Sequence, residues 1–189
     1  MRNFGRVYAM SVRQAALFSL VAVLATGAAA QQPLADVKVH GSTVTENNAR
    51  ADTLERRADA YLLTPRHWRK AAQLHRRAGE LRSEDPSSVR SFRMAAWLYH
   101  ATDAPGLARS MMEKAAERAA AVGDVEQAAV SYIDAALLAS ADDHHRVPKL
   151  LRKTRVLLDA PLFPAESRAD LLRRIQGTSQ LAVAWNESR

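Results

Sequence analysis

Regularly spaced alanines within helix-forming segments are the feature that most constrains how this chain can fold. Between Phe92 and Ala115, two runs with apolar residues at helical spacing flank the turn sequence Asp-Ala-Pro-Gly. Residues three and four positions apart lie on the same face of a helix, so each run predicts an amphipathic helix. Two such helices joined by a short break are expected to pack antiparallel, as a helical hairpin.

This hairpin pattern recurs on both sides of the stretch. The separations are 38 residues from Ala58 to Ala96 and from Tyr61 to Tyr99, 37 from Ala71 to Ala108 and from Ala78 to Ala115, and 39 from Ala96 to Ala135 and from Met112 to Leu151. A fixed period of about 20–50 residues, with one pair of helices per period, is typical of an α-solenoid. Small residues recur because two helices cross closely only where a small side chain lets their backbones approach.

The recurring positions resemble those of the tetratricopeptide-repeat (TPR) superfamily over roughly residues 45–158. The best copy has the family's first-helix pattern at Phe92, Ala95, Ala96 and Tyr99, and its second-helix pattern at Ala108, Met112 and Ala115. An earlier copy comprises Leu54, Ala58, Tyr61, Ala71, His75 and Ala78. A second register also fits, with the turn and second helix at Gly123-Asp124, Ala128, Tyr132 and Ala135, preceded by Ala116. The period is longer than the family's, which is about 34 residues, and alanine stands where the family has glycine.

We therefore predict an all-α protein whose antiparallel helical hairpins stack as a short TPR-like α-solenoid, with about three hairpins plus a terminal helix. The alternative is a plain helical bundle with alanine-rich crossings. The residues expected to make the repeat contacts are Ala58, Tyr61, Ala71, Ala78, Phe92, Ala96, Tyr99, Ala108, Met112, Ala115, Ala128, Tyr132 and Ala135.

Capping and proline signals predict the helix boundaries. The first helix is expected to begin near Thr45–Asn48 and to end before Pro65, where the second begins. Asp103 is expected to cap the fourth helix, which ends at Gly123, a left-handed C-terminal residue. Asp124, with Gln127 three positions on, is expected to cap the fifth. A sixth helix begins near Val147-Pro148, and a shorter seventh ends at Gly177.

The composition favours helices and excludes sulfur chemistry. Alanine and leucine dominate the 48% hydrophobic content, and only 7 glycines and 7 prolines interrupt 189 residues. The chain has no cysteine, which excludes disulfides, thiolate metal sites, thiol nucleophiles and a lipidated N-terminal cysteine.

The N-terminus reads as a secretory signal peptide over residues 1–30. Three arginines precede the apolar run 15–25, and small residues lead to a cleavage site expected after Ala30. The run is shorter than the roughly 20 residues that span a bilayer, and an uncleaved anchor is the alternative. Met10 is a second candidate initiator. We expect an exported protein, periplasmic or secreted, with a flexible leader at 31–45, a helical domain at 46–176 and a tail at 177–189.

The second predicted helix is the most basic segment. Its basic residues are Arg66, Arg69, Lys70, Arg76, Arg77 and Arg82, against the single acid Glu80. The ordinary interpretation is a solvated face. The functional interpretation is an anionic contact made by Arg66, Arg69, Lys70, Arg76 and Arg77, such as a membrane surface or an acidic partner. Removing the three arginines of residues 1–30 takes the formal charge from +7 to +4, which favours anionic partners weakly. Export and the absence of a recognised motif argue against nucleic acid.

Metal and catalytic patterns are weak. The run Asp142-Asp143-His144-His145 has metal-ligand side chains, but four adjacent residues cannot all converge on one ion, so capping and solvation are expected instead. We find no nucleophile elbow, zinc-protease helix or phosphate-binding glycine loop, and predict no cofactor and no enzymatic activity.

The aromatic residues allow two interpretations. Trp68, Trp97 and Tyr99, with Met111 and Met112, are expected either in the core or along a binding groove. What the resemblance implies is a non-catalytic scaffold that holds a protein or peptide segment in the concave groove between hairpins. The alternative function is binding to a membrane surface or polyanion through the basic second helix.

Overall fold

The computed structural model describes residues 35–82, 85–161 and 163–187. It divides into two units, residues 1–40 and residues 41–189. The signal peptide expected at residues 1–30 lies outside the described residues. Within the part that is described, no helix is both long and apolar enough to cross a membrane.

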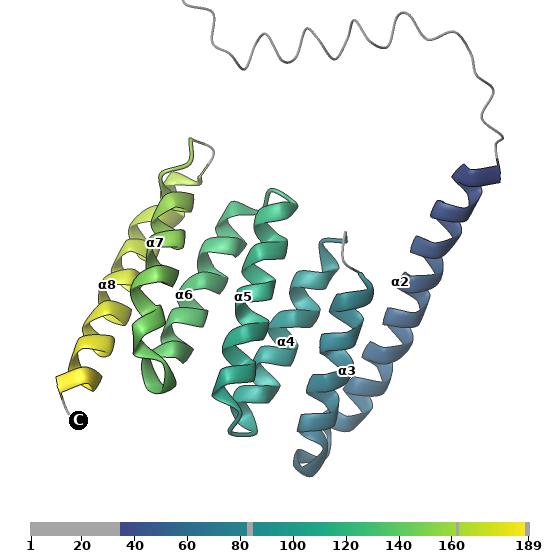
Figure 1. The fold of residues 1–189 in the computed structure, drawn as a ribbon, viewed down its shortest axis with the longest axis horizontal. Helices are drawn as coiled ribbons and strands as arrows, with labels where there is room; N and C mark the ends of the chain where they lie inside the picture. The colour runs from purple at the N-terminus through teal and green to yellow at the C-terminus, as the bar shows by residue number, and fades with distance from the viewer. Residues whose placement is uncertain (1–34, 83–84, 162, 188–189) are drawn as a thin grey trace, which may run out of the picture. The chain divides into compact units, whose positions relative to one another are not determined.

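The fold is all-α, as predicted, with consecutive helices packed side by side in chain order (Figure 1). Residues 35–82, 85–161 and 163–187 contain no β-strand. The elements are α2 (Ala35–Leu62), the 3-10 turn η1 (Pro65–His67), α3 (Trp68–Leu81), α4 (Ser87–Ala101), α5 (Pro105–Ala121), α6 (Val125–Asp142), the 3-10 turn η2 (His144–Arg146), α7 (Val147–Leu158) and α8 (Ala165–Glu187).

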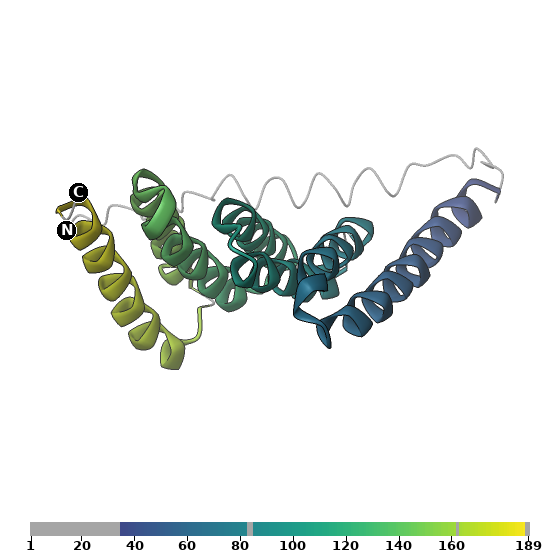
Figure 2. The ribbon, with the colours of Figure 1, turned by 90° about the horizontal axis from the view of Figure 1, so that it is seen from below.

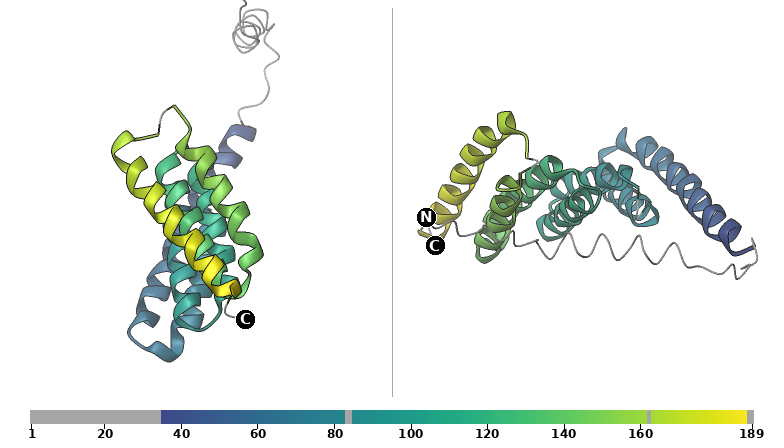
Figure 3. Two further views of the ribbon diagram at one scale, coloured as in Figure 1. Left: turned by 90° about the vertical axis from the view of Figure 1, so that its left-hand side faces the viewer. Right: turned by 90° about the horizontal axis from the view of Figure 1, so that it is seen from above.

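Each helix packs against its neighbours in the chain. Helix α4 lies between α3 and α5, α5 between α4 and α6, and α6 contacts both α7 and α8. Figure 2 shows the same order from below, and the left view of Figure 3 shows α8 running obliquely across the last helices. The result is a repeat-like stack in which the core forms where successive helices meet.

Alanine occupies the helix crossings. All thirteen residues expected to make repeat contacts are buried except Tyr61, which is half-buried and packs against the core. The eight alanines among them are wholly inaccessible to solvent. Because a methyl side chain adds little width, the neighbouring backbones can approach at these positions.

Cation–aromatic contacts show which helices are equivalent. The Nζ of Lys114 on α5 lies 5.6 Å from the ring centre of Phe92 on α4, and the Nζ of Lys153 on α7 lies 4.8 Å from that of Tyr132 on α6. Phe92 and Tyr132 are 40 residues apart and the two lysines 39. The repeating units are therefore the pairs α4/α5 and α6/α7, with α2/α3 preceding them, rather than pairs that begin at α5.

Two of the predicted caps are correct and one is wrong. Gly123 has a left-handed φ of +84°, and the Asp124 carboxylate accepts a hydrogen bond of 3.0 Å from the backbone N–H of Gln127, as expected. Asp103 does not cap α5, whose N-cap is Ala104. Asp103 instead has φ +53° and carries the turn between α4 and α5. Aspartate tolerates this left-handed conformation better than most residues.

Two helix boundaries also differ from prediction. Helix α2 begins at Ala35, so of the leader expected at 31–45 only residues 31–34 lie outside the described part. Helix α8 continues through Gly177 to Glu187, where a C-terminal tail was expected. A single glycine costs a helix only about 1 kcal/mol, which flanking helix-forming residues offset when no proline follows.

Candidate functional site

The first helices of the successive pairs are joined by a line of polar contacts. The Ser91 hydroxyl on α4 donates to the carboxylate of Glu55 on α2 at 2.6 Å. Arg93 on α4 lies 3.8 Å from the carboxylate of Asp134 on α6, and Arg174 on α8 donates to the same carboxylate at 2.6 Å. We call the side of the stack on which α2, α4, α6 and α8 meet the first-helix face.

A hollow of about 580 Å³ opens on this face beside α4. Trp97, 48% exposed, lines it together with Met94, Arg90 and Arg93. These four residues are spaced three and four apart, so one side of α4 presents all of them. Its other lining residues include Val122 and Asp124, in the turn between α5 and α6, and Gln127, in the first turn of α6.

A second hollow of about 350 Å³ adjoins the first between α2 and α4. Arg90 and Met94 line both hollows, which therefore form one strip along the first-helix face. The second hollow is more polar, and its remaining lining residues are Asp52, Glu55, Arg56, Asp59, His75 and Ser91.

Two of the acids that line the second hollow, Asp52 and Glu55, are paired with a buried arginine. Arg82, at the end of α3, is 7% exposed; one guanidinium nitrogen lies 2.8 Å from a Glu55 oxygen and another bonds to Asp52. Burial lowers the pKa of Arg82, but its hydrogen bonds and attraction to Glu55 and Asp52 outweigh burial and raise the pKa overall. Arg82 is thereby neutralised by its partners and is directed into the fold, away from any ligand.

His75 is the least satisfied group of the second hollow. It is 5% exposed, and neither ring nitrogen has a hydrogen-bond partner among the described residues. Burial lowers its pKa below the usual 6.5, although Asp59, 3.7 Å from Nε2, and Glu55 act in the opposite direction. The imidazole is therefore neutral at pH 7.

The aromatic residues separate into core and surface. Tyr99, Met111 and Met112 are buried, and the indole N–H of the half-buried Trp68 donates to the Leu62 carbonyl at 2.9 Å. Trp97 alone of this predicted set is exposed. Arg90, Arg93 and Met94 were not predicted as site residues, although their spacing relative to Trp97 was a signal that sequence analysis could have used.

The basic residues of η1 and α3 lie apart from this strip. Arg66, Arg69, Lys70 and Arg77 are exposed, and Arg76 lies 3.8 Å from Glu80 one turn away. Lys70 lies 4.7 Å from the ring centre of Tyr61 and lowers the pKa of that phenol by hydrogen bonding and charge. None of these residues lines either hollow.

Of the run Asp142-Asp143-His144-His145, the last three side chains are described, and they do not form a ligand cluster. Asp143 pairs with Arg109 at 3.3 Å and with Arg146 at 3.1 Å, and the rings of His144 and His145 lie 4.0 Å apart. Over the described ranges, no three His, Cys, Asp or Glu side chains are placed to hold a metal ion.

Comparison with protein-family models, with curated proteins and with solved structures finds no match to this chain.

Proposed function

We propose that the protein is an exported, non-catalytic TPR-like scaffold that binds a segment of another protein along the first-helix face. The observation that carries this proposal is the exposure of Trp97 in a hollow that it shares with Met94, Arg90 and Arg93. Tryptophan, arginine and methionine are enriched in protein interfaces, and tryptophan and arginine supply a large share of the binding energy there.

The chemistry of the strip suggests what the segment carries. Trp97 and Met94 offer apolar surface for one hydrophobic side chain, and the adjacent Arg90 is an exposed donor for a carboxylate or a backbone carbonyl. The acids of the second hollow are partly occupied by Arg82 and Ser91. The segment is therefore expected to place its apolar anchor and an acceptor group over α4.

Site-specific photocrosslinking in the native host tests this proposal. A photoreactive amino acid at position 97 is expected to yield a discrete crosslinked protein, because position 97 would lie within the interface. The matched control is position 107 on α5, where Leu107 is also exposed but lines neither hollow. Trp97→Ala is expected to weaken capture without lowering the melting temperature, since the side chain is on the surface. Identical crosslinking at both positions, or full capture by Trp97→Ala, would contradict the proposal.

A second candidate function rests on the exposure of Arg66 in η1 and of Arg69 and Arg77 in α3. Such a row suits an anionic membrane surface, each residue contributing about 1 kcal/mol near the headgroups. Cosedimentation with vesicles of phosphatidylglycerol in phosphatidylcholine tests it. Vesicle binding that disappears in high salt and in the variant Arg66→Glu/Arg69→Glu/Arg77→Glu would favour this function. If the variant sediments with the vesicles to the same extent as the wild type, this function is excluded.

A further inference from the structure

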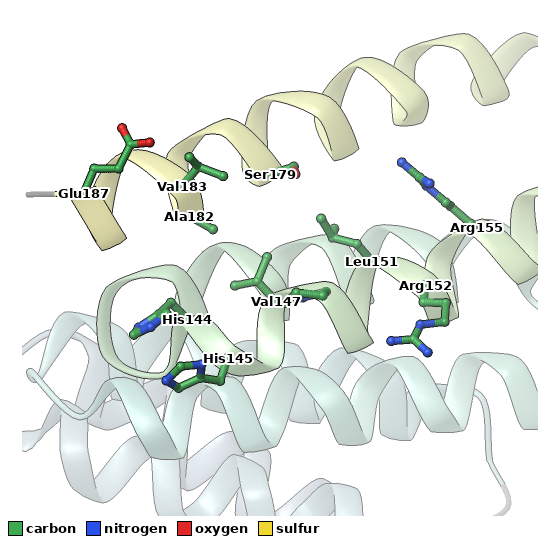
Figure 4. A pocket seen from close by; sticks show the side chains of 11 residues that line it. His144, His145, Val147, Leu151, Arg152, Arg155, Ser179, Ala182, Val183 and Glu187 are labelled. Carbon is green, nitrogen blue, oxygen red and sulfur yellow. The ribbon is translucent and has the colours of Figure 1, made fainter.

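A second surface feature lies at the C-terminal end of the stack, far in sequence from the hollow beside Trp97. A hollow of about 540 Å³ separates α7 from the C-terminal half of α8. Figure 4 shows Val147 and Leu151 of α7 facing Ala182 and Val183 of α8 across it. Arg152 and Arg155 stand at one end and His144 at the other. We call this hollow the α7/α8 groove.

Helix α8 lies where the first helix of a fourth pair would lie. Asp134 of α6 contacts Arg93 of α4 on one side and Arg174 of α8 on the other. These partners are 41 and 40 residues from Asp134 in the sequence, so α8 stands to α6 as α6 stands to α4. Helices α2, α4 and α6 are each followed by a second helix that completes the pair. In the described part of the chain, no helix takes that place beside α8, and the α7/α8 groove lies there.

The second helices of the three pairs are α3, α5 and α7, and ion pairs link each of them to the next. Glu80 of α3 pairs with Lys114 of α5 at 3.4 Å, and Glu117 of α5 pairs with Lys153 of α7 at 3.5 Å. Glu113 of α5 likewise lies 3.3 Å from Arg146. Acids on α3 and α5 thus pair with bases on the next second helix or, for Arg146, in the turn η2 just before it.

The equivalent positions on α7 carry no acid. Lys153 is 39 residues after Lys114, and adding 39 to Glu113 and Glu117 gives Arg152 and Val156. Arg155 adds a further exposed cation in the α7/α8 groove. Of the described residues that line the groove, Glu187 alone is acidic. A helix that lies here therefore meets apolar side chains flanked by arginines.

From this pattern we propose that the α7/α8 groove binds an amphipathic helix of a partner protein, with acidic residues flanking its apolar ridge. Charge complementarity selects this occupant, because two arginines would otherwise be left without partners in a partly desolvated interface.

Two labelled model peptides test the proposal by fluorescence anisotropy. Both are amphipathic helices of about 20 residues with leucine and alanine on one face. One carries glutamate beside the apolar ridge, and the other carries lysine at the same positions. The protein is the full gene product, purified after expression with its own N-terminus. We expect the glutamate peptide to bind at least about tenfold more tightly than the lysine peptide, with a preference that narrows at high salt.

Two variants and one control locate the binding in the groove. The double variant Arg152→Glu/Arg155→Glu is expected to bind the lysine peptide more tightly than the glutamate peptide. Val183→Lys is expected to lower the affinity for the glutamate peptide about tenfold, because the substitution places a charge among the apolar contacts. Leu181→Lys is the matched control: Leu181 is exposed on the same helix, 47% against 55% for Val183, but does not line the groove. Melting temperatures establish that each variant is folded.

Several outcomes would overturn the proposal. They are equal affinity for both peptides, no binding of the glutamate peptide, or an unchanged preference in the double arginine variant. Light scattering that shows a dimer abolished by Val183→Lys would assign the groove to a second copy instead. Trp97→Ala is expected to bind the glutamate peptide normally, so failure here is distinguishable from failure of the function proposed above.

Discussion

At the scale of single residues, small side chains decide how closely the helices approach. Gly79 on α3 illustrates this: a Cβ atom added there would lie 3.1 Å from the ring of Phe92 on α4. The glycine makes room for an aromatic ring that is itself covered by Lys114. The alanines at the other crossings act in the same way, with a methyl group in place of a hydrogen atom.

The same close packing encloses one polar group, His75, whose ring nitrogens have no hydrogen-bond partner among the described residues. The imidazole is enclosed beside α2 and α4, and Asp59, Glu55 and Arg90 are the charged groups around it. Because burial disfavours the charged form, its pKa in the folded protein is below 6.5. The unfolded chain therefore takes up a proton here as the pH falls through 6.5, while the folded protein does not.

This difference predicts a loss of stability in mild acid. The free energy of unfolding is expected to fall as the pH drops from above 6.5 towards the lower pKa of folded His75, because the unfolded state binds more protons in that range. The variant His75→Leu is expected to lose this part of the pH dependence. Urea unfolding followed by circular dichroism at several pH values measures it. The control is His100→Gln, a change at an exposed histidine of α4. If the free energy of unfolding of His75→Leu depends on pH as steeply as that of the wild type, the prediction is contradicted.

At the scale of helices, two glycines have opposite roles. Gly123 ends the α5 segment with φ +84°, a conformation that other residues adopt only with strain. Gly177 lies inside α8 with no atom within 4 Å of an added Cβ, and its backbone is helical. Neither position is crowded, so only the backbone conformation distinguishes them.

Alanine at these two positions is therefore expected to change stability with opposite signs. Gly177→Ala is expected to raise the free energy of unfolding by about 0.5–1 kcal/mol, since alanine is the better helix former. Gly123→Ala is expected to lower it by about 1 kcal/mol, because alanine is strained at positive φ. Chemical denaturation of both variants alongside the wild type measures the differences. A destabilising Gly177→Ala would show that α8 is not helical at this position.

At the scale of the whole second unit, stability depends on how many neighbours each helix has. Helices α5 and α6 are covered on both sides, and their buried residues include Met112 and Ile133. The C-terminal half of α8 is exposed at Leu181 and Val183 and borders the open α7/α8 groove. In a stack in which each unit contacts only its neighbours, the ends open at lower free energy than the middle.

Hydrogen exchange is expected to follow this order. Amides of α5 and α6 should exchange most slowly, and those of α8 after Thr178 should exchange among the fastest in helices α3 to α8. Mass spectrometry of peptic fragments provides the measurement. The glutamate peptide described above is expected to slow exchange in α7 and α8 selectively. Uniform protection of all helices would instead indicate a single cooperative unit without an open end.

The sequence by itself determined the features that depend on a few consecutive residues. The helical periodicity, the alanines of the crossings and the Gly123–Asp124 boundary were all predictable, because propensities and caps act within one or two turns. The same local signals misplaced the start of α2 and the end of α8. Gly177 resembled a terminator of α8, and residues 31–45 show no helical period that would place the start of α2 at Ala35.

The tertiary structure decided which side of each helix meets a neighbour. Trp97 and Tyr99 stand two residues apart on α4, yet one is exposed and the other buried. Likewise Arg82, counted with the basic residues of α3, is enclosed by Glu55 and Asp52, which precede it by about thirty residues. A periodic pattern is the same whether a partner helix covers the apolar face or leaves it open. Only the packed arrangement could therefore reveal the strip beside Trp97 and the groove between α7 and α8.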